Sequence, residues 1–585
     1  MILDQAERAL ESGNLIKAYN LAREASATEA TDPRLRFIEV LSLARMGDTS
    51  HAWELYDTYD LGTIESADAL SLKARLLKDN ALNEEQPQPA ALREAAEAYR
   101  QAFAATGSAF PLVNAATLAC AAGDRKLSRS LAETVLHILQ SAAEEGYWPW
   151  ITKAEAYFVL GREDEAVHAA RAALAQEDAS LGARSSTIKQ FERLMPLISA
   201  EGDLPEEMLG HLRPPPVIHY CGHMFSDGAD FEARLAFDVQ ATLTKLRVQI
   251  GYGALAAGSD IILAEQLMNC GAELNVVLPF SIDEFKKVSV APAGPSWIGR
   301  FDRCCTGAAS VTIVSNMAYV NDPRQIGYGG EVAMGMTVLR SSHLGGRAHQ
   351  LAIWDGGPRL SLAGTSADVS TWAAAGRDTE IIPYPAPRTP GQFTAVETRN
   401  VELIERDAHA ILFADFSGFS KIGEQNLIFF WNGVMGRIAK VLDRFSESVL
   451  CKNTWGDALY LIINETAVAA ELALSLQEEV QSLDMSLLGP ESRGLRVALH
   501  YGTMYRANDP VTERTNYFGS EVSKAARLEP VTPHRSVYVT QPFAAVLALK
   551  KKSEFDLHYI GDIALAKDYG NQPIYRLQRS RRSTV

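Results

Sequence analysis

Two aspartates stand out because each follows an apolar run at a point where a strand is expected to end. Asp415 closes the run "AILFAD", and a Ser-Gly-Phe turn leads from it into a helix. Asp457 follows Gly456 in "TWGDALYLII", a pattern typical of a hairpin turn. Two carboxylates that converge on one cleft can hold a pair of Mg²⁺ ions, which lower the pKa of an attacking hydroxyl and neutralise phosphate oxygens. The sequence therefore predicts metal-dependent phosphate chemistry near the C-terminus.

Four segments place these aspartates in a longer pattern. "LFADFSGFS", "TWGDALYL", "LRVALHYGTMY" and "NYFGSEVSKAARLE" follow one another in an order and spacing that resembles class III adenylate and guanylate cyclase domains. The resemblance covers residues 408–578 and implies an α+β, ferredoxin-like catalytic domain. It implies a phosphorus–oxygen lyase that converts a nucleoside triphosphate into a 3′,5′-cyclic nucleotide and pyrophosphate.

The resemblance also implies roles for individual residues. Asp415 and Asp457 would bind Mg²⁺ or Mn²⁺, two ions per site, with help from the backbone carbonyl of Phe416. Arg527 would stabilise the charge that builds up on the α-phosphate. Lys567, in "ALAKDYGNQPIY", would grip the triphosphate, although the alignment slips there by one residue. Because the family divides these groups between two domains and this chain has one, we expect a head-to-tail homodimer.

The positions that select the nucleobase depart from the family patterns. They are Asn453 and Asn516, whereas lysine with aspartate or threonine suits adenine and glutamate with cysteine suits guanine. An amide both donates and accepts hydrogen bonds, so it fits adenine or a pyrimidine. ATP ranks first on family frequency, UTP or CTP next, and GTP last. Ser523 stands where an asparagine usually orients the ribose, and Thr503 where some relatives have a phosphate-binding arginine, with Arg506 nearby.

These departures leave two other functions open. A degenerate cyclase fold would bind nucleotide as a regulatory module without catalysis, and a scaffold would use its other domains to recruit partners. A pyrimidine product would, by analogy, indicate an antiviral circuit. The presence of both aspartates and of Arg527 favours the enzyme.

Composition limits the possible partners. The chain has 585 residues, of which 47% are hydrophobic and 22% charged, and this length predicts several domains. A net charge of −16 disfavours nonspecific binding to nucleic acid or to an anionic membrane. We find neither a signal peptide nor a run of about 18 apolar residues. The six cysteines form no CxxC pair, so we expect a reducing, cytoplasmic location.

Residues 1–205 predict an α-helical repeat solenoid. Ala- and Leu-rich helical patterns end at Gly13, Gly47, Gly123 and Gly161, and the first two are 34 residues apart. The segments "GNLIKAYNLAREA" and "AEAYFVLGREDEAVHAARAALAQ" resemble tetratricopeptide repeats. Such a solenoid offers a concave groove for another protein or for the neighbouring domain of the same chain.

Residues 215–385 predict an α/β domain with a parallel sheet. Three prolines after Arg213 break the helical region, and short β-rich runs then alternate with helical stretches. "GYGALAAGSDIILAEQL" and "WDGG" resemble Rossmannoid nucleotide-sensing domains, which implies a small-molecule ligand. A proline-containing linker at 386–407 leads to the cyclase-like segment. We expect the two N-terminal domains to regulate the pairing of catalytic domains.

Overall fold

The computed structural model describes residues 2–26, 32–64, 66–141, 145–198, 206–226, 228, 230–359, 361–384, 405–489, 493–550 and 554–580. The chain divides into two compact units. The first contains residues 1–214 with 342–346 and 580–585, and the second contains 215–341 with 347–579. Most of the predicted linker, namely residues 386–404, lies outside the described residues.

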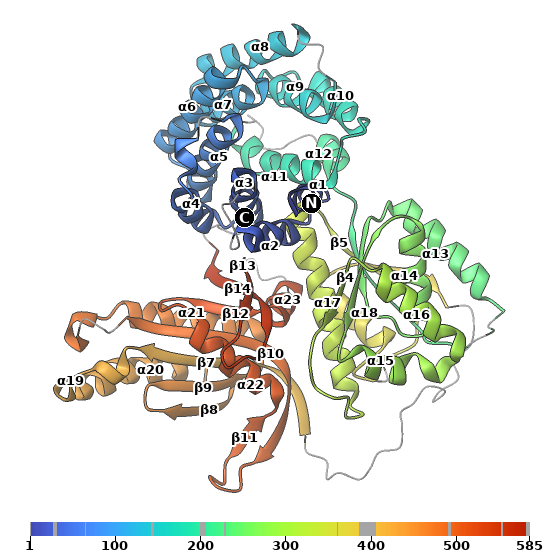
Figure 1. Ribbon diagram of the computed structural model, residues 1–585, viewed down its shortest axis with the longest axis vertical. Helices are drawn as coiled ribbons and strands as arrows, with labels where there is room; N and C mark the ends of the chain where they lie inside the picture. Colours follow the sequence, from blue (N-terminus) through green and yellow to red (C-terminus); the bar gives the residue numbers. More distant parts are fainter. Residues whose placement is uncertain are drawn as a thin grey trace. The chain divides into compact units, whose positions relative to one another are not determined.

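The first unit is helical, as predicted. Its helices pack mainly against their neighbours in sequence (Figure 1), because small Ala side chains on the buried faces allow close approach. The helices are α1 Ile2–Glu11, α2 Leu15–Ser26, α3 Pro33–Met46, α4 Thr49–Thr58, α5 Ala67–Asn83, α6 Pro89–Thr106, α7 Ala109–Ala121, α8 Arg125–Ser141, α9 Tyr147–Val159, α10 Glu163–Leu174, α11 Leu181–Ile198 and α12 Glu206–Leu212.

The predicted helix stops are confirmed by the backbone. Gly13, Gly47, Gly123 and Gly161 have φ values of 68°, 95°, 87° and 75°. Only glycine adopts this left-handed conformation without strain, so each position ends a helix and reverses the chain.

The second unit begins with a six-stranded sheet in the order β4-β3-β2-β1-β5-β6. All of its strand pairs are parallel, which confirms the predicted α/β class. The strands are β1 Val217–Gly222, β2 Ile250–Gly253, β3 Glu273–Leu278, β4 Ser310–Ile313, β5 Ala348–Trp354 and β6 Thr379–Pro383. The sequence did not predict β6, a short edge strand on which only Ile382 is buried.

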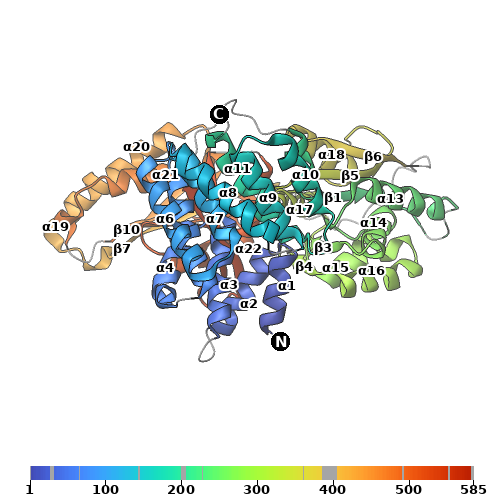
Figure 2. The ribbon, with the colours of Figure 1, turned by 90° about the horizontal axis from the view of Figure 1, so that it is seen from above.

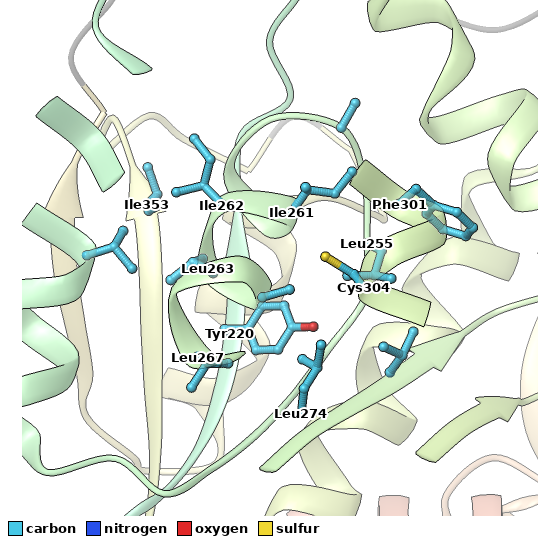
Figure 3. Close-up of a cluster of buried hydrophobic side chains, with 14 of the residues drawn as sticks. Tyr220, Leu255, Ile261, Ile262, Leu263, Leu267, Leu274, Phe301, Cys304 and Ile353 are labelled. Atoms are coloured by element: carbon cyan, nitrogen blue, oxygen red, sulfur yellow. The ribbon is translucent and has the colours of Figure 1, made fainter. Parts of the chain in front are cut away.

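Helices connect these strands, as crossovers in a parallel sheet require. Helices α13, α14 and α16 lie side by side next to the sheet (Figure 1). The helices are α13 Glu232–Leu246, α14 Ser259–Asn269, α15 Ile282–Ser289, α16 Pro295–Gly307, α17 Pro323–Leu344 and α18 Thr365–Ala374. Figure 3 shows how Ile261, Ile262 and Leu263 of α14 pack with Tyr220 of β1 and Phe301 of α16 in one buried cluster.

The rest of the second unit is a mixed eight-stranded sheet. Seven strands follow the order β13-β14-β12-β10-β7-β9-β8, and β11 pairs with β10. The β10–β12 pair is parallel, whereas β10–β7, β7–β9 and β8–β9 are antiparallel. The strands are β7 Glu405–Ser417, β8 Val449–Trp455, β9 Ala458–Ile463, β10 Gly494–Asn508, β11 Thr515–Phe518, β12 Val537–Thr540, β13 Phe555–Ala564 and β14 Asn571–Arg579.

Five helices accompany this sheet: α19 Glu424–Phe429, α20 Gly436–Arg444, α21 Thr466–Gln481, α22 Ser520–Leu528 and α23 Gln541–Leu549. A π-helical turn, Phe430–Met435, joins α19 to α20 in one continuous run, which Figure 2 shows in orange. Single π turns of this kind are frequent near functional sites.

In the described part of the chain, no helix is long and apolar enough to cross a membrane. All six cysteines are free thiols, as the absence of paired spacing predicted.

One close backbone contact in the first unit gives a stability test. A Cβ at Gly182 of α11 would lie 2.0 Å from the carbonyl oxygen of Leu10 in α1. We expect Gly182→Ala to destabilise the protein by about 1–3 kcal/mol, since rigid backbone must move to admit the methyl group. Calorimetric unfolding of the full chain would show a lower transition temperature.

The control is Gly210→Ala on α12, where an added Cβ meets no atom within 4 Å. We expect this variant to unfold at or slightly above the wild-type temperature, because alanine favours helix. Equal unfolding temperatures for Gly182→Ala and the wild type would contradict the prediction.

Candidate active site

The structure brings Asp415 and Asp457 together. Asp415 lies near the end of β7, and Asp457 lies in the two-residue turn between the paired residues Trp455 and Ala458. Strand β9 pairs with β7, so the hairpin turn is carried to the end of β7. The hairpin was predicted from the Gly-Asp pair, and Gly456 has the left-handed φ of 65° that this turn requires.

The two carboxylates influence each other electrostatically. Burial, the charge of Asp415 and a hydrogen bond to Asp415 raise the pKa of Asp457 to about 6, while the backbone N–H of Phe416 donates to Asp457 and opposes the rise. The Phe416 ring packs in the core against Phe430, 5.1 Å between centroids. Two carboxylates held this close disfavour simultaneous ionisation unless a cation or a donor compensates them.

Two further charged residues in this site were not predicted from the sequence. Arg496 Nη2 lies 2.6 Å from Asp415 Oδ2, and its Nε lies 2.6 Å from Glu529 Oε1. Burial raises the pKa of Glu529 to about 7, Arg496 opposes this shift, and the charges of Asp415 and Asp457 add to it. The available signal was the arginine inside the otherwise largely apolar strand "LRVALHYG", which pairs with Asp415 across β7 and β10.

The chemistry of the donors fits a divalent cation. Within the described ranges, no three His, Cys, Asp or Glu side chains are grouped to hold a metal ion by themselves. Mg²⁺, however, is commonly bound through one or two protein carboxylates, with substrate phosphates and water completing its shell. The protein ligands could come from Asp415, Asp457 and the carbonyl of Phe416. A bound cation would also relieve the repulsion between the two aspartates.

Ser523 and Arg527 lie on one face of α22, because residues four apart on a helix are neighbours. Ser523 is exposed and its hydroxyl lies 3.5 Å from the carbonyl oxygen of Gly519, a weak contact. Arg527 is partly exposed, and in the described part of the chain it forms no ion pair with Asp415 or Asp457. Both side chains are therefore available to a ligand.

Lys567 lies beside the end of α22. It sits in the turn between β13 and β14, where it is exposed and has a φ of 59°. The backbone N–H of Ala566 donates to the carbonyl of Arg527, 3.2 Å, and the Tyr569 hydroxyl donates to the carbonyl of Ser520, 3.2 Å. These two bonds attach the lysine turn to both ends of the helix that carries Ser523 and Arg527.

Asn453 and Asn516 belong to neighbouring strands. Cys451 Sγ of β8 lies 4.0 Å from Asn516 Oδ1 of β11, and Asn453 follows Cys451 by two residues on the same face of β8. The Asn516 amide is fixed in orientation, since its Nδ2 donates to Asp509, 3.3 Å, and its Oδ1 accepts from the N–H of Tyr517, 2.9 Å. The Cys451 thiol is a second donor to Oδ1, so one N–H of Asn516 is left for another partner.

The structure also shows the surroundings of Thr503, the position at which some relatives have a phosphate-binding arginine. Thr503 is buried, and its hydroxyl accepts from Arg406 Nη2 at 2.9 Å. Arg506 lies farther along β10 and pairs with Glu405 at 2.9 Å. The guanidinium beside Thr503 is thus that of Arg406, a residue that was not predicted from the sequence.

Comparisons with known proteins match two parts of the chain. Residues 401–578 match the family model "Adenylate and Guanylate cyclase catalytic domain". Residues 14–119 match "TPR-S: Tetratricopeptide Repeats-Sensor". A comparison with curated proteins found no match.

Several solved structures are similar to part of the chain. The guanylate cyclase domain of RhGC from Catenaria anguillulae with GTP has 16% identity, covers 30% of this chain and 99% of its own, and has a TM-score of 0.26. The adenylyl cyclase CyaB from P. aeruginosa has 17% identity, 31% and 98% coverage, and a TM-score of 0.26. A dimeric guanylyl cyclase domain of RhoGC from Blastocladiella emersonii has 17% identity, 30% and 99% coverage, and a TM-score of 0.26.

The aspartate pair gives a test of metal binding without turnover. We expect Mn²⁺ to raise the unfolding temperature of the wild type. At a Mn²⁺ concentration of about 100 times the Kd, binding should add about 2.7 kcal/mol to the free energy of unfolding. Asp457→Asn should lose this effect, and without metal it should be at least as stable as the wild type, because the repulsion is removed. Thermal unfolding with and without Mn²⁺ measures both effects.

The matched control is Asp443→Asn, which removes an exposed carboxylate from α20 in the same domain. It should keep the full response to Mn²⁺. An Asp457→Asn chain that gains as much stability from Mn²⁺ as the wild type would exclude this pair as the metal site.

Proposed function

We propose, from the premise that residues 401–578 are a class III nucleotide cyclase domain, that this protein converts ATP into 3′,5′-cyclic AMP and pyrophosphate. The observation that carries the proposal is the convergence of Asp415 and Asp457 on the backbone of Phe416 inside that domain. A domain that had lost catalysis would have no need to keep two like charges this close.

We assign separate roles in the reaction to the residues of this site. The 3′-oxygen of the ribose forms a bond to the α-phosphorus, and the bond from that phosphorus to the leaving pyrophosphate breaks. Divalent cations held by Asp415 and Asp457 would supply the acidity that activates the 3′-hydroxyl and would neutralise phosphate charge. Arg527 stabilises the charge on the α-phosphate, Ser523 orients the ribose, and Lys567 binds the outer phosphates.

Adenine is the base that we propose, with UTP or CTP next and GTP last. Asn516 keeps one N–H after its local hydrogen bonds are counted. This N–H matches the acceptor N1 of adenine, and the amide of Asn453 on β8 offers an oxygen for the donor N6. The same amide groups can pair with the edge of a pyrimidine, which places UTP and CTP next.

We propose that the active form is a head-to-tail homodimer. The cyclase domain exposes several large apolar side chains: Ile428 is 73% exposed, Trp431 58%, Trp455 65% and Phe518 47%. Exposed apolar side chains of this size favour a protein interface. Trp455 lies two residues from Asp457, so a partner that covers it reaches the metal site, where the Arg527 of that partner would complete catalysis.

We propose that the repeats and the middle domain regulate this reaction in response to a protein or small-molecule signal. The match of residues 14–119 to sensor-type repeats supports a receiving role for the first unit. The middle domain shares one compact unit with the cyclase domain, which supports direct control of catalysis.

Turnover of each triphosphate tests the activity and the base. We expect purified full-length protein with Mn²⁺ or Mg²⁺ to form a cyclic nucleotide from ATP faster than from UTP, CTP or GTP, measured by mass spectrometry. Asp415→Ala should lower the rate by at least about 100-fold, because a metal carboxylate is lost, whereas Asp443→Ala should not. No cyclic product from any triphosphate would contradict the proposed activity, and preference for another base would correct the substrate.

Mixing of inactive chains tests the shared site. Asp457→Ala and Arg527→Ala chains should each be inactive alone, and an equal mixture should regain about one quarter of wild-type activity. Half of the dimers would be mixed, and each of these would hold one intact site out of two. A mixture as inactive as its components, with exchange of subunits verified, would place both residues in a single-chain site.

A further inference from the structure

Helix α22 has a second face, opposite to the one that carries Ser523 and Arg527. Glu521 and Lys524 lie on it, three residues apart, and are 1% and 3% exposed. Burial of a carboxylate costs free energy unless hydrogen bonds and opposite charge surround it. The position of α22 therefore depends on the groups that surround Glu521.

Two of these groups belong to the cyclase domain. Glu521 Oε2 lies 2.6 Å from His500 Nε2 and 3.0 Å from Lys524 Nζ. Burial lowers the pKa of His500 against the opposing effect of Glu521, and its Nε2–H donates to Glu521 because a carboxylate only accepts. Burial alone would raise the pKa of Glu521, but Lys524 and then His500 bring it down to about 2.

The other carboxylate oxygen is bound by the middle domain. Ser315 Oγ donates to Glu521 Oε1 at 2.5 Å, and Lys524 Nζ donates to the carbonyl of Val314 at 3.3 Å. Ser315 is 3% exposed, so water does not replace it readily. Val314 and Ser315 lie in the segment 314–322, here named the β4–α17 loop, which leaves the carboxyl end of β4.

The β4–α17 loop is fastened to its own domain. The N–H of Val314 donates to the carbonyl of Leu278 in β3, 2.9 Å, and the N–H of Tyr319 donates to Glu284 of α15, 2.7 Å. The loop therefore moves with the middle sheet. Ligands of open parallel sheets bind beyond the carboxyl ends of the strands, which is the edge from which this loop emerges.

Helix α17 of the middle domain holds the neighbouring strand β10. The Tyr328 hydroxyl donates to the backbone carbonyl of Tyr501, 2.7 Å, and the Tyr501 hydroxyl donates to Glu331, 2.9 Å. Tyr501 follows His500 directly, so α17 fixes the strand that presents His500 to Glu521. Gly502 comes next, and a Cβ there would lie 2.7 Å from Glu521 Cγ.

We propose that Glu521 is a positioning residue through which Ser315 of the middle domain sets the orientation of α22, and hence of Ser523 and Arg527. The β4–α17 loop is then the route by which a change at the ligand-binding edge of the middle sheet reaches the catalytic face of α22. The inference specifies how the proposed cyclase is regulated and rests on that function for its kinetic readout.

The test compares full-length Ser315→Ala, Ser315→Thr and wild type. Ser315→Ala should lower kcat about tenfold with less than about twofold change in KM, because Arg527 acts on the transition state. Ser315→Thr keeps the hydroxyl and should restore kcat. The matched control is Ser310→Ala, which removes a hydroxyl that donates to Asn275 within the middle domain, 2.6 Å, and should leave kcat unchanged.

Amide hydrogen exchange gives a readout that needs no turnover. Exchange in α22, Ser520–Leu528, should be faster in Ser315→Ala than in the wild type or Ser310→Ala. Gly502→Ala should produce the same kcat loss from the cyclase side, because it displaces Glu521.

The outcomes separate this inference from the proposed activity. A wild type without cyclase activity refutes the proposed function, and the exchange data then decide the positioning role by themselves. If the wild type is active, two results would overturn the inference. One is a kcat of Ser315→Ala within twofold of the wild-type kcat, and the other is an equal loss of kcat in Ser310→Ala. Unchanged exchange in α22 would overturn it as well.

Discussion

The proximity of two like charges is the constraint on which the C-terminal domain depends. Asp415 and Asp457 are held near each other by the pairing of β7 with β9 and by a two-residue turn, and an N–H of β7 donates to Asp457. Repulsion between their charges raises the free energy of the folded state in the absence of a cation. Arg496 reduces this cost at Asp415 by pairing with it at 2.6 Å. A site built in this way favours a divalent cation on electrostatic grounds alone.

Strand β7 is central because it pairs with a different strand on each side. On one side β9 supplies the hairpin of Asp457, and on the other β10 supplies Arg496 opposite Asp415. The side chain of Phe416 is buried, so only its backbone faces the carboxylates. The same strand thus contributes one proposed metal ligand, the support for a second and part of the core.

Helix α22 connects the two halves of the second unit through its buried face. Its exposed face carries Ser523 and Arg527, and its buried face carries the carboxylate of Glu521. One oxygen of that carboxylate is bound by a residue of the middle domain, and the other oxygen is bound by residues of the cyclase domain. A buried charge with partners on two domains makes the geometry of each domain depend on the other, which a purely apolar contact would do less strictly.

The sequence alone predicted much of this protein. The four glycine stops and the parallel middle sheet follow from local backbone preference and periodicity, which act over a few residues. The cyclase-like domain was predicted from the resemblance of four segments to class III cyclases. The Gly-Asp turn and the strand ending in Asp415 were predicted on the same grounds. Edge strand β6 was not predicted, because few of its side chains are buried and its hydrophobic pattern is therefore weak.

The tertiary structure decided which distant residues meet. Arg496 and Glu529 join the aspartates, Arg406 lies against Thr503, and Ser315 binds Glu521 across 206 positions of sequence. Each of these side chains has an ordinary local context, and nothing in its own segment indicates a partner. Strand register and domain packing create these contacts, and both are fixed by the burial of side chains far apart in the chain.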